Sequence, residues 1–196
     1  QKGRTTAPEA KPVKPVADDV VDATIKHCTP VVRDMILLQQ LTGMRPGEVC
    51  AITPGMIDRS EAVWIATLPT HKSAWRGKDR AIYLGPKAQA IILPYLLRAA
   101  DAPLFSPREA DRQRRDKLRA GRKTPPRQGN GPGTNRKAKP ATAPTSQYST
   151  SSYSNAIRYA CAKAYPMPKD STKEEAAAWR AAYWWTPNRL RHSAAT

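Results

Sequence analysis

The strongest constraint on the fold is a change in the spacing of apolar residues early in the chain. Up to about residue 52 the apolar residues recur at helical spacing. The helical stretches are bounded by Pro30, Gly43 and Pro46, residues of types that start or end helices. Two short runs at 62–66 and 80–84 then contain β-branched and aromatic residues around a polar tip, which favours a hairpin. The sequence therefore predicts an α+β fold, mainly helical, with a small antiparallel sheet. Helical spacing returns at 87–98, 148–164 and 171–182.

The domain boundaries follow from composition. The 196 residues suffice for one domain with its own core. Residues 1–17 have little apolar periodicity and are interpreted as a linker or tail, which leaves 18–196 as the domain. Residues 106–147 interrupt it as a basic insertion, with twelve Lys or Arg against three acids between 108 and 139. The first half of the insertion can be helical. Its Pro-, Gly- and Asn-rich second half is expected to be disordered unless it binds a partner.

The charge of the chain indicates a polyanionic partner. There are 33 Lys and Arg against 16 Asp and Glu, a formal net charge of +17. Nucleic acid is the favoured partner and an anionic membrane surface the alternative. No apolar run approaches the roughly 20 residues of a membrane span, so we expect no membrane insertion and a cytoplasmic location. The cysteines lack metal-ligand spacing, so no metal site and buried, reduced thiols are expected at Cys28, Cys50 and Cys161.

Two arginine-containing motifs stand at opposite ends of the predicted domain. Arg45 follows the helix that ends at Gly43, within residues 42–49, and Arg191 lies in a helix opened by Thr186 and Pro187. Arginine stays protonated at neutral pH and presents a planar fork of donors that matches phosphate oxygens. Two arginines from distant segments therefore suggest a site for a phosphate group of a nucleic-acid backbone.

These motifs resemble those of a known family. Residues 42–49 are similar to the box with the first catalytic arginine of the tyrosine recombinase (phage integrase) family. Residues 186–196 resemble its second box, and residues 69–73 with 77–85 resemble the β-hairpin that carries its catalytic lysine. The order, spacing and expected local structure of the three motifs match over about residues 18–196.

The resemblance implies a site-specific recombinase of phage integrase or transposon type. Such enzymes integrate and recombine DNA without metal or cofactor, through a covalent 3′-phosphotyrosine, as a homotetramer on two double-stranded DNA sites. It also implies a bacterial or phage-derived protein associated with the nucleoid. Arg45 and Arg191 match the two arginines that bind the non-bridging oxygens where negative charge develops.

The hairpin motif supplies the candidate proton donor. Lys72 matches the lysine that protonates the departing 5′ oxygen in the family. Lys78 is a rival for that role at the same hairpin, and both lysines can instead only position phosphate. His71 and Arg80 are candidate DNA contacts, and so are the basic residues of the insertion's first half: Arg112, Arg114, Arg115, Lys117 and Arg119.

Three further residues support or modify the site. Asn188 stands where the family usually has His, and an amide donates to phosphate but transfers no proton at neutral pH. Glu48, three residues after Arg45, either orients that guanidinium or caps the helix. His192, beside Arg191, either braces the site by hydrogen bonding or acts on substrate.

The nucleophile of the family is missing from the matched region. In the family the tyrosine follows the second box by some tens of residues, and here none of the seven tyrosines follows it. We therefore expect this chain to bind DNA without forming the covalent intermediate. The alternative is a non-catalytic DNA-binding regulator, or a mobile-element remnant, on the same scaffold.

Overall fold

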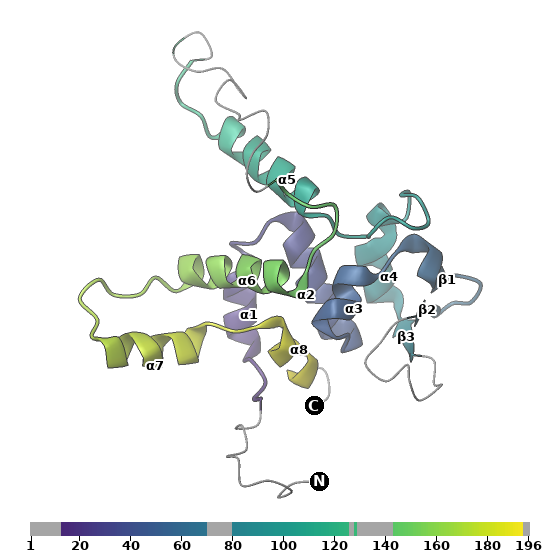
Figure 1. The fold of residues 1–196 in the computed structure, drawn as a ribbon, viewed down its shortest axis with the longest axis horizontal. Helices are drawn as coiled ribbons and strands as arrows, with labels where there is room; N and C mark the ends of the chain where they lie inside the picture. The colour runs from purple at the N-terminus through teal and green to yellow at the C-terminus, as the bar shows by residue number, and fades with distance from the viewer. Residues whose placement is uncertain (1–12, 70–79, 126–127, 129–142, 194–196) are drawn as a thin grey trace, which may run out of the picture.

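The computed structural model describes residues 13–69, 80–125, 128 and 143–193. Over these residues the chain is mainly helical with one small antiparallel sheet, as the sequence predicts (Figure 1). The helices are α1 (Asp18–Ile25), α2 (Pro30–Thr42), α3 (Pro46–Ala51), α4 (Pro86–Ile92), α5 (Pro107–Ala120), α6 (Thr150–Ala164), α7 (Lys173–Tyr183) and α8 (Pro187–Ser193). The strands are β1 (Ile57–Asp58), β2 (Trp64–Leu68) and β3 (Arg80–Leu84), with 3-10 turns at η1 (Pro54–Met56) and η3 (Leu93–Tyr95).

The sheet has the order β1-β2-β3, and both pairings are antiparallel. Residues of β2 and β3 alternate between the core and solvent, so Ala66 and Ile82 are paired and buried while Tyr83 is exposed. The predicted strand 80–84 is thus confirmed, whereas the other strand, predicted at 62–66, begins and ends two residues later. Residues 70–79, which join β2 to β3, lie outside the described part of the chain.

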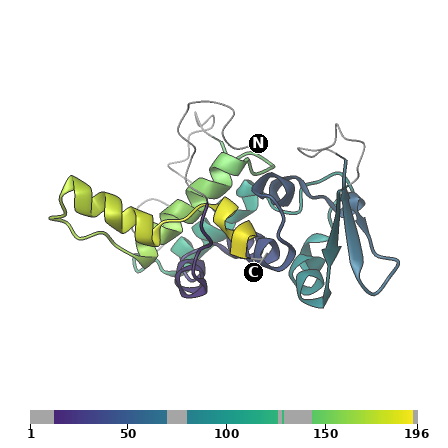
Figure 2. The same cartoon turned by 90° about the horizontal axis from the view of Figure 1, so that it is seen from below.

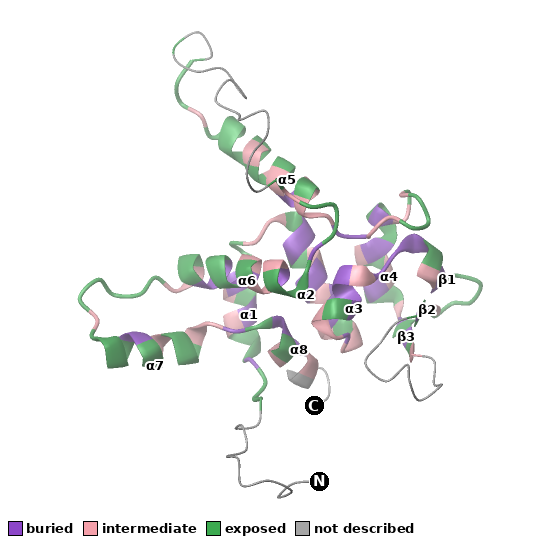
Figure 3. Ribbon diagram, in the orientation of Figure 1, coloured by how far each residue is buried: buried purple, intermediate pink, exposed green. Residues whose placement is uncertain are grey.

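Helix α2 is the centre of the core. Pro30 is its first residue, and Gly43 ends it in the left-handed conformation, with φ of 61°. This conformation strains any residue with a Cβ, which explains a glycine here. The helix packs against α4, α5, α6 and α8 and is buried around most of its circumference (Figure 3). Its buried apolar side chains are Val31, Val32, Met35, Ile36 and Leu38.

Helix α4 ends earlier than the apolar spacing predicts. The expected helix covers 87–98, whereas the α-helical part stops at Ile92 and continues as η3. Pro94 explains the difference, because proline has no N–H to continue the ladder and disfavours α conformation in the residue before it. The prediction of that helix end was wrong.

Helices α5 and α7 extend from the body and are mostly exposed (Figures 1 and 3). Each buries a single residue, Ala110 in α5 and Ala176 in α7. Helix α5 meets α2 near its first turn, where Val31 donates to Gln113, and α8 meets it near its last turn, where Gln39 donates to Pro187. The sheet and α7 lie at opposite ends of the molecule (Figure 2). Within the aromatic run before α8, only Trp185 is fully in the core. The Tyr183 ring instead stacks on the Tyr165 ring, with 4.5 Å between their centroids, and so joins the last residue of α7 to the residue that follows α6.

The thiols are buried and free. Cys50 and Cys161 are buried and Cys28 is half-buried, without a disulfide. Burial raises the pKa of Cys28 and of Cys50 to about 12, so these thiols stay protonated and unreactive. In the described ranges no helix has the length and apolar character to cross a membrane.

Candidate functional site

Arg45 is fixed where α2 turns into α3. The left-handed Gly43 reverses the chain, Met44 is buried, and Arg45 is the N-cap residue of α3. Glu48 reaches back over the first turn: its Oε2 accepts from the Arg45 backbone N–H at 2.7 Å and its Oε1 from Arg45 Nη1 at 2.8 Å. Glu48 therefore both caps the helix and orients the guanidinium, so the two roles considered for it coexist.

A second arginine contacts the same carboxylate. Arg80, the first residue of β3, places Nε 2.5 Å from Glu48 Oε1 as an ion pair, although its N–H is not aligned for a hydrogen bond. The Glu48 side chain is 6% exposed. Burial alone raises the pKa of Glu48, but the hydrogen bond from the Arg45 backbone, the adjacent Arg80 guanidinium and the hydrogen bond from the Arg45 guanidinium lower it overall. Glu48 is therefore an anion shared by two arginines.

Arg191 of α8 interacts electrostatically with Arg45, Arg80 and Glu48. Its pKa is lowered by burial first and then by the positive charges of Arg45 and Arg80, while Glu48 opposes the shift. Two guanidiniums, those of Arg45 and Arg80, thus pair with the Glu48 carboxylate, and that of Arg191 interacts electrostatically with all three residues. We call Arg45, Arg80, Arg191 and Glu48 the arginine cluster. With one internal counter-ion for three cations, the arginine cluster is suited to receive a further anion.

A buried amide connects the two elements that carry Arg45 and Arg191. Gln39 is fully buried, and its Nε2 donates to the carbonyl of Met44 at 3.0 Å and to that of Pro187 at 2.9 Å. Its Oε1 accepts from the Tyr153 hydroxyl of α6 at 3.1 Å. Met44 directly precedes Arg45, and Pro187 is the first residue of α8. We call this set of three hydrogen bonds the Gln39 clamp.

The Gln39 clamp was missed at the sequence level. The only signal is a glutamine in helical register with Val32 and Ile36, on a face that is otherwise apolar. A buried amide needs partners for its donors and acceptor, but the sequence does not reveal that one partner lies on α8.

A pocket of about 350 Å³ brings Arg45 and Asn188 together. Its wall comes from the start of α3, from Thr150 at the start of α6 and from Thr186 and Pro187 at the start of α8. Asn188 is exposed, so its amide is accessible from the pocket. The predicted residues Arg45 and Asn188 therefore line one pocket. Arg191 and Arg80 join Arg45 through the electrostatic interactions of the arginine cluster.

The remaining predicted residues lie elsewhere. The five basic residues assigned to the insertion are all on α5, which extends away from the arginine cluster (Figure 1). His71, Lys72 and Lys78 fall in 70–79, outside the described residues. His192 belongs to α8, but its side chain is likewise outside the described part.

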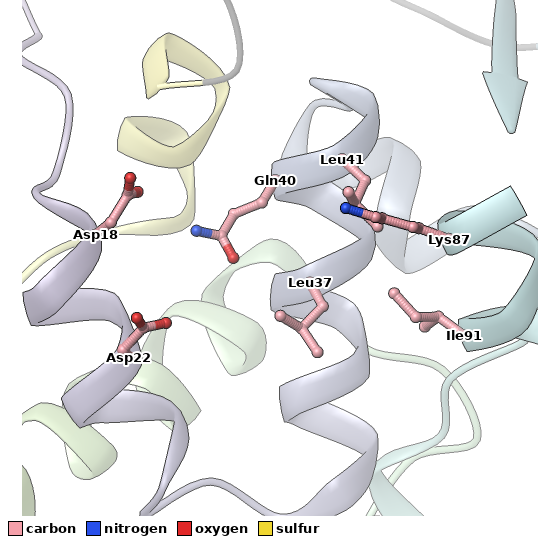
Figure 4. A pocket seen from close by; sticks show the side chains of 7 residues that line it. All are labelled: Asp18, Asp22, Leu37, Gln40, Leu41, Lys87 and Ile91. Atoms are coloured by element: carbon pink, nitrogen blue, oxygen red, sulfur yellow. The ribbon is translucent and has the colours of Figure 1, made fainter. Parts of the chain in front are cut away.

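A further pocket of about 530 Å³ lies between α1, α2 and α4 (Figure 4). Asp18 and Asp22 line it from α1, Leu37, Gln40 and Leu41 from α2, and Lys87 and Ile91 from α4. None of these is a predicted site residue. Among the described residues no group of three or more His, Cys, Asp or Glu is placed to bind a metal.

Comparison with protein-family models, with curated proteins and with solved structures found no match to this chain.

Proposed function

We propose that this chain is the DNA-binding catalytic domain of a site-specific tyrosine recombinase, and that Arg45 and Arg191 bind one phosphodiester of duplex DNA. The observation that carries the proposal is the arginine cluster, in which Arg45 of the first motif pairs with Glu48 and Arg191 of the second motif interacts electrostatically with both. The resemblance of the motifs supplies the reaction class. The net charge of +17 supports a polyanionic partner.

The chemistry of the site follows from its fixed geometry. In phosphoryl transfer, negative charge grows on the non-bridging oxygens as phosphorus becomes pentacoordinate. Arg45, already oriented by Glu48, and Arg191, on a helix joined to the Arg45 segment by the Gln39 clamp, stabilise that charge without reorganising. Asn188 donates a hydrogen bond to phosphate from its amide but supplies no proton. Proton donation to the leaving oxygen is assigned to Lys72, on the resemblance.

The proposal assigns DNA binding, and not strand cleavage, to the chain alone. Burial raises the pKa of Tyr148 and of Tyr153, so these phenols stay protonated, and Tyr153 donates to Gln39. Tyr83 is exposed, but it is on the face of β3 opposite to Ile82. In the family the nucleophile follows the second box, and the recombinase acts as a tetramer on two sites.

One observation favours a second candidate. Asn188 in place of His removes a proton-transfer group, which suits a non-catalytic DNA-binding regulator or a mobile-element remnant on the same scaffold.

A nicked suicide substrate tests whether this chain contains the nucleophile. We expect no covalent adduct with this chain, and a stable adduct would contradict the assignment of DNA binding alone.

The test of the proposed site is duplex DNA binding by fluorescence anisotropy over a range of salt concentrations. Arg45→Gln and Arg191→Gln should each weaken binding, and together they should reduce the salt slope by about 0.9, the value for one neutralised phosphate. Arg33→Gln is the matched control, since it removes the same charge from a side chain 48% exposed and paired with Asp34. Equal losses in all three variants would refute the site, and tighter binding to RNA than to duplex DNA would refute the partner.

A further inference from the structure

Helix α5 carries a row of arginines on one face. Its six basic residues exceed its three acidic residues, and Ala110 is its only buried residue. At about 100° per residue, Arg108, Arg112, Arg115 and Arg119 fall within about 60° of one another around the helix axis. They extend over about 16 Å at 1.5 Å per residue. We call these four residues the arginine stripe.

The arginine stripe lies opposite to the face that fixes α5 to the body. By the same geometry, Ala110 is about 190° from the centre of the stripe. Gln113, about 130° from it, accepts a hydrogen bond from the Val31 backbone N–H of α2 at 3.4 Å. Glu109 forms an ion pair with Arg98 at the base of the helix. The packing of α5 on α2 therefore directs the stripe outward, away from the core.

The arginines of the stripe are incompletely neutralised. Asp111 pairs with Arg115 at 2.7 Å and also with Arg114, and Asp116 lies 3.5 Å from Arg119. Arg108 donates to the Pro144 carbonyl, and Arg112 has no ion pair among the described residues. These ion pairs are at the surface, where they contribute little free energy, so phosphates can replace the aspartates. The same face is hollowed by a groove of about 390 Å³ lined by the stripe, Asp111 and Asp116.

We infer that the arginine stripe is a second binding surface for duplex DNA, which contacts phosphates outside the stretch bound at the arginine cluster. The choice of duplex DNA rests on the proposed function. Because α5 meets α2 near Val31 and α8 meets it near Gln39, about two turns further along the helix, the stripe and the arginine cluster lie at different ends of α2 (Figure 1). The stripe therefore binds a flanking part of the same DNA or a second duplex.

Charge and composition favour a nucleic-acid backbone over a membrane surface. A membrane-binding amphipathic helix presents an apolar face with Trp, Phe or Leu. In α5 the one large exposed apolar residue is Leu118, 63% exposed, and it has no apolar neighbour on the same face. The duplex backbone carries about one charge per 1.7 Å, so 16 Å of DNA offers more phosphates than the stripe has arginines.

The experiment measures how the affinity for a 40-base-pair duplex depends on salt for two triple variants and one double variant of the whole chain. The stripe variant is Arg112→Gln, Arg115→Gln and Arg119→Gln, which leaves the Arg108 contact to Pro144 intact. The first control, Arg158→Gln, Lys163→Gln and Lys173→Gln, removes three exposed cations from α6 and α7. The second, Arg114→Gln with Lys117→Gln, removes cations of α5 outside the stripe. Circular dichroism verifies that each variant keeps its helix content.

We expect the stripe variant to reduce the salt slope by about 2 to 3, and each control by less than 1. The reduction should persist in a chain that also carries Arg45→Gln and Arg191→Gln, which separates failure of the stripe from failure of the proposed site. Equal reductions in the stripe variant and the first control would overturn the inference. The inference would also be overturned if the stripe variant lost binding to anionic phospholipid vesicles or to duplex RNA but kept its binding to duplex DNA.

Discussion

Replacement of Gln39 by leucine tests whether the Gln39 clamp positions the two arginines. The substitution keeps the approximate size of a fully buried side chain but removes all three of its hydrogen bonds. The Tyr153 hydroxyl loses its acceptor, and the carbonyls of Met44 and Pro187 lose a donor. A buried polar group without a partner costs about 1–3 kcal/mol of folding free energy. The cost is smaller for a carbonyl, which has two lone pairs, than for a hydroxyl donor.

With the gain from burying leucine subtracted, we expect Gln39→Leu to lower the free energy of unfolding by about 2–4 kcal/mol. Urea denaturation measures this quantity. At temperatures where the variant is fully folded, α8 is no longer fastened to Met44, so the affinity for duplex DNA should fall as well. Tyr153→Phe should have a smaller effect on both quantities, because it removes one hydrogen bond and leaves both carbonyl contacts in place.

Gln40→Leu is the matched control. Gln40 is the next residue of α2, half-buried at the pocket between α1 and α4, and the hydrogen bond to Pro187 of α8 comes from Gln39 and not from Gln40. Its replacement should change stability by less than about 0.5 kcal/mol. Equal effects of Gln39→Leu and Gln40→Leu on stability would refute the clamp. A stability loss at Gln39 with unchanged DNA affinity of the folded protein would refute its positioning role.

Three further outcomes follow from the arginine cluster. Because the pKa of Glu48 is lowered in the folded protein, the folded state binds fewer protons than the unfolded state, so stability falls as pH drops below the ordinary value of 4.5. Glu48→Gln should flatten this acid dependence in urea titrations between pH 3 and 6, and an unchanged profile would contradict the ion pairing. Arg80→Gln should weaken DNA binding more than Arg59→Gln, a control at an exposed position; the reverse order in anisotropy titrations would place Arg80 outside the site. Asn188→His should make DNA binding tighter at pH 5.5 than at pH 7.5, because imidazole gains charge near its ordinary pKa of about 6.5. If the ratio of variant to wild-type DNA affinity is the same at both pH values, position 188 does not face the phosphate.

Local signals in the sequence predicted much of the fold. Pro30 and Gly43 bound α2 as expected, because proline suits the first turn and only glycine adopts the left-handed end without strain. Composition and alternation predicted the strand at 80–84, and a strand at 62–66 that the structure has at 64–68. Strand β1 was not predicted, since two residues carry no recognisable pattern. These features depend on neighbours along the chain, which is why the sequence reveals them.

The site itself was only partly predictable. The motifs identified Arg45, Arg191 and Asn188, and Arg80 was expected only as a DNA contact. Its ion pair with Glu48 depends on how β3 packs against α3, which no local pattern encodes. The Gln39 hydrogen bond to Pro187 likewise joins residues far apart in the sequence. Tertiary partners of buried polar groups are what the sequence leaves undetermined.

The central claim is that Arg45 and Arg191 bind the same phosphodiester, and a double-mutant cycle on duplex DNA affinity tests it most directly. Anisotropy titrations of the wild type, Arg45→Gln, Arg191→Gln and the double variant give the coupling energy between the two side chains. Residues that share one partner show coupling of about 0.5–3 kcal/mol. We predict a coupling energy in this range. Strictly additive losses would contradict the claim, because they would mean that the two arginines contact separate phosphates or none.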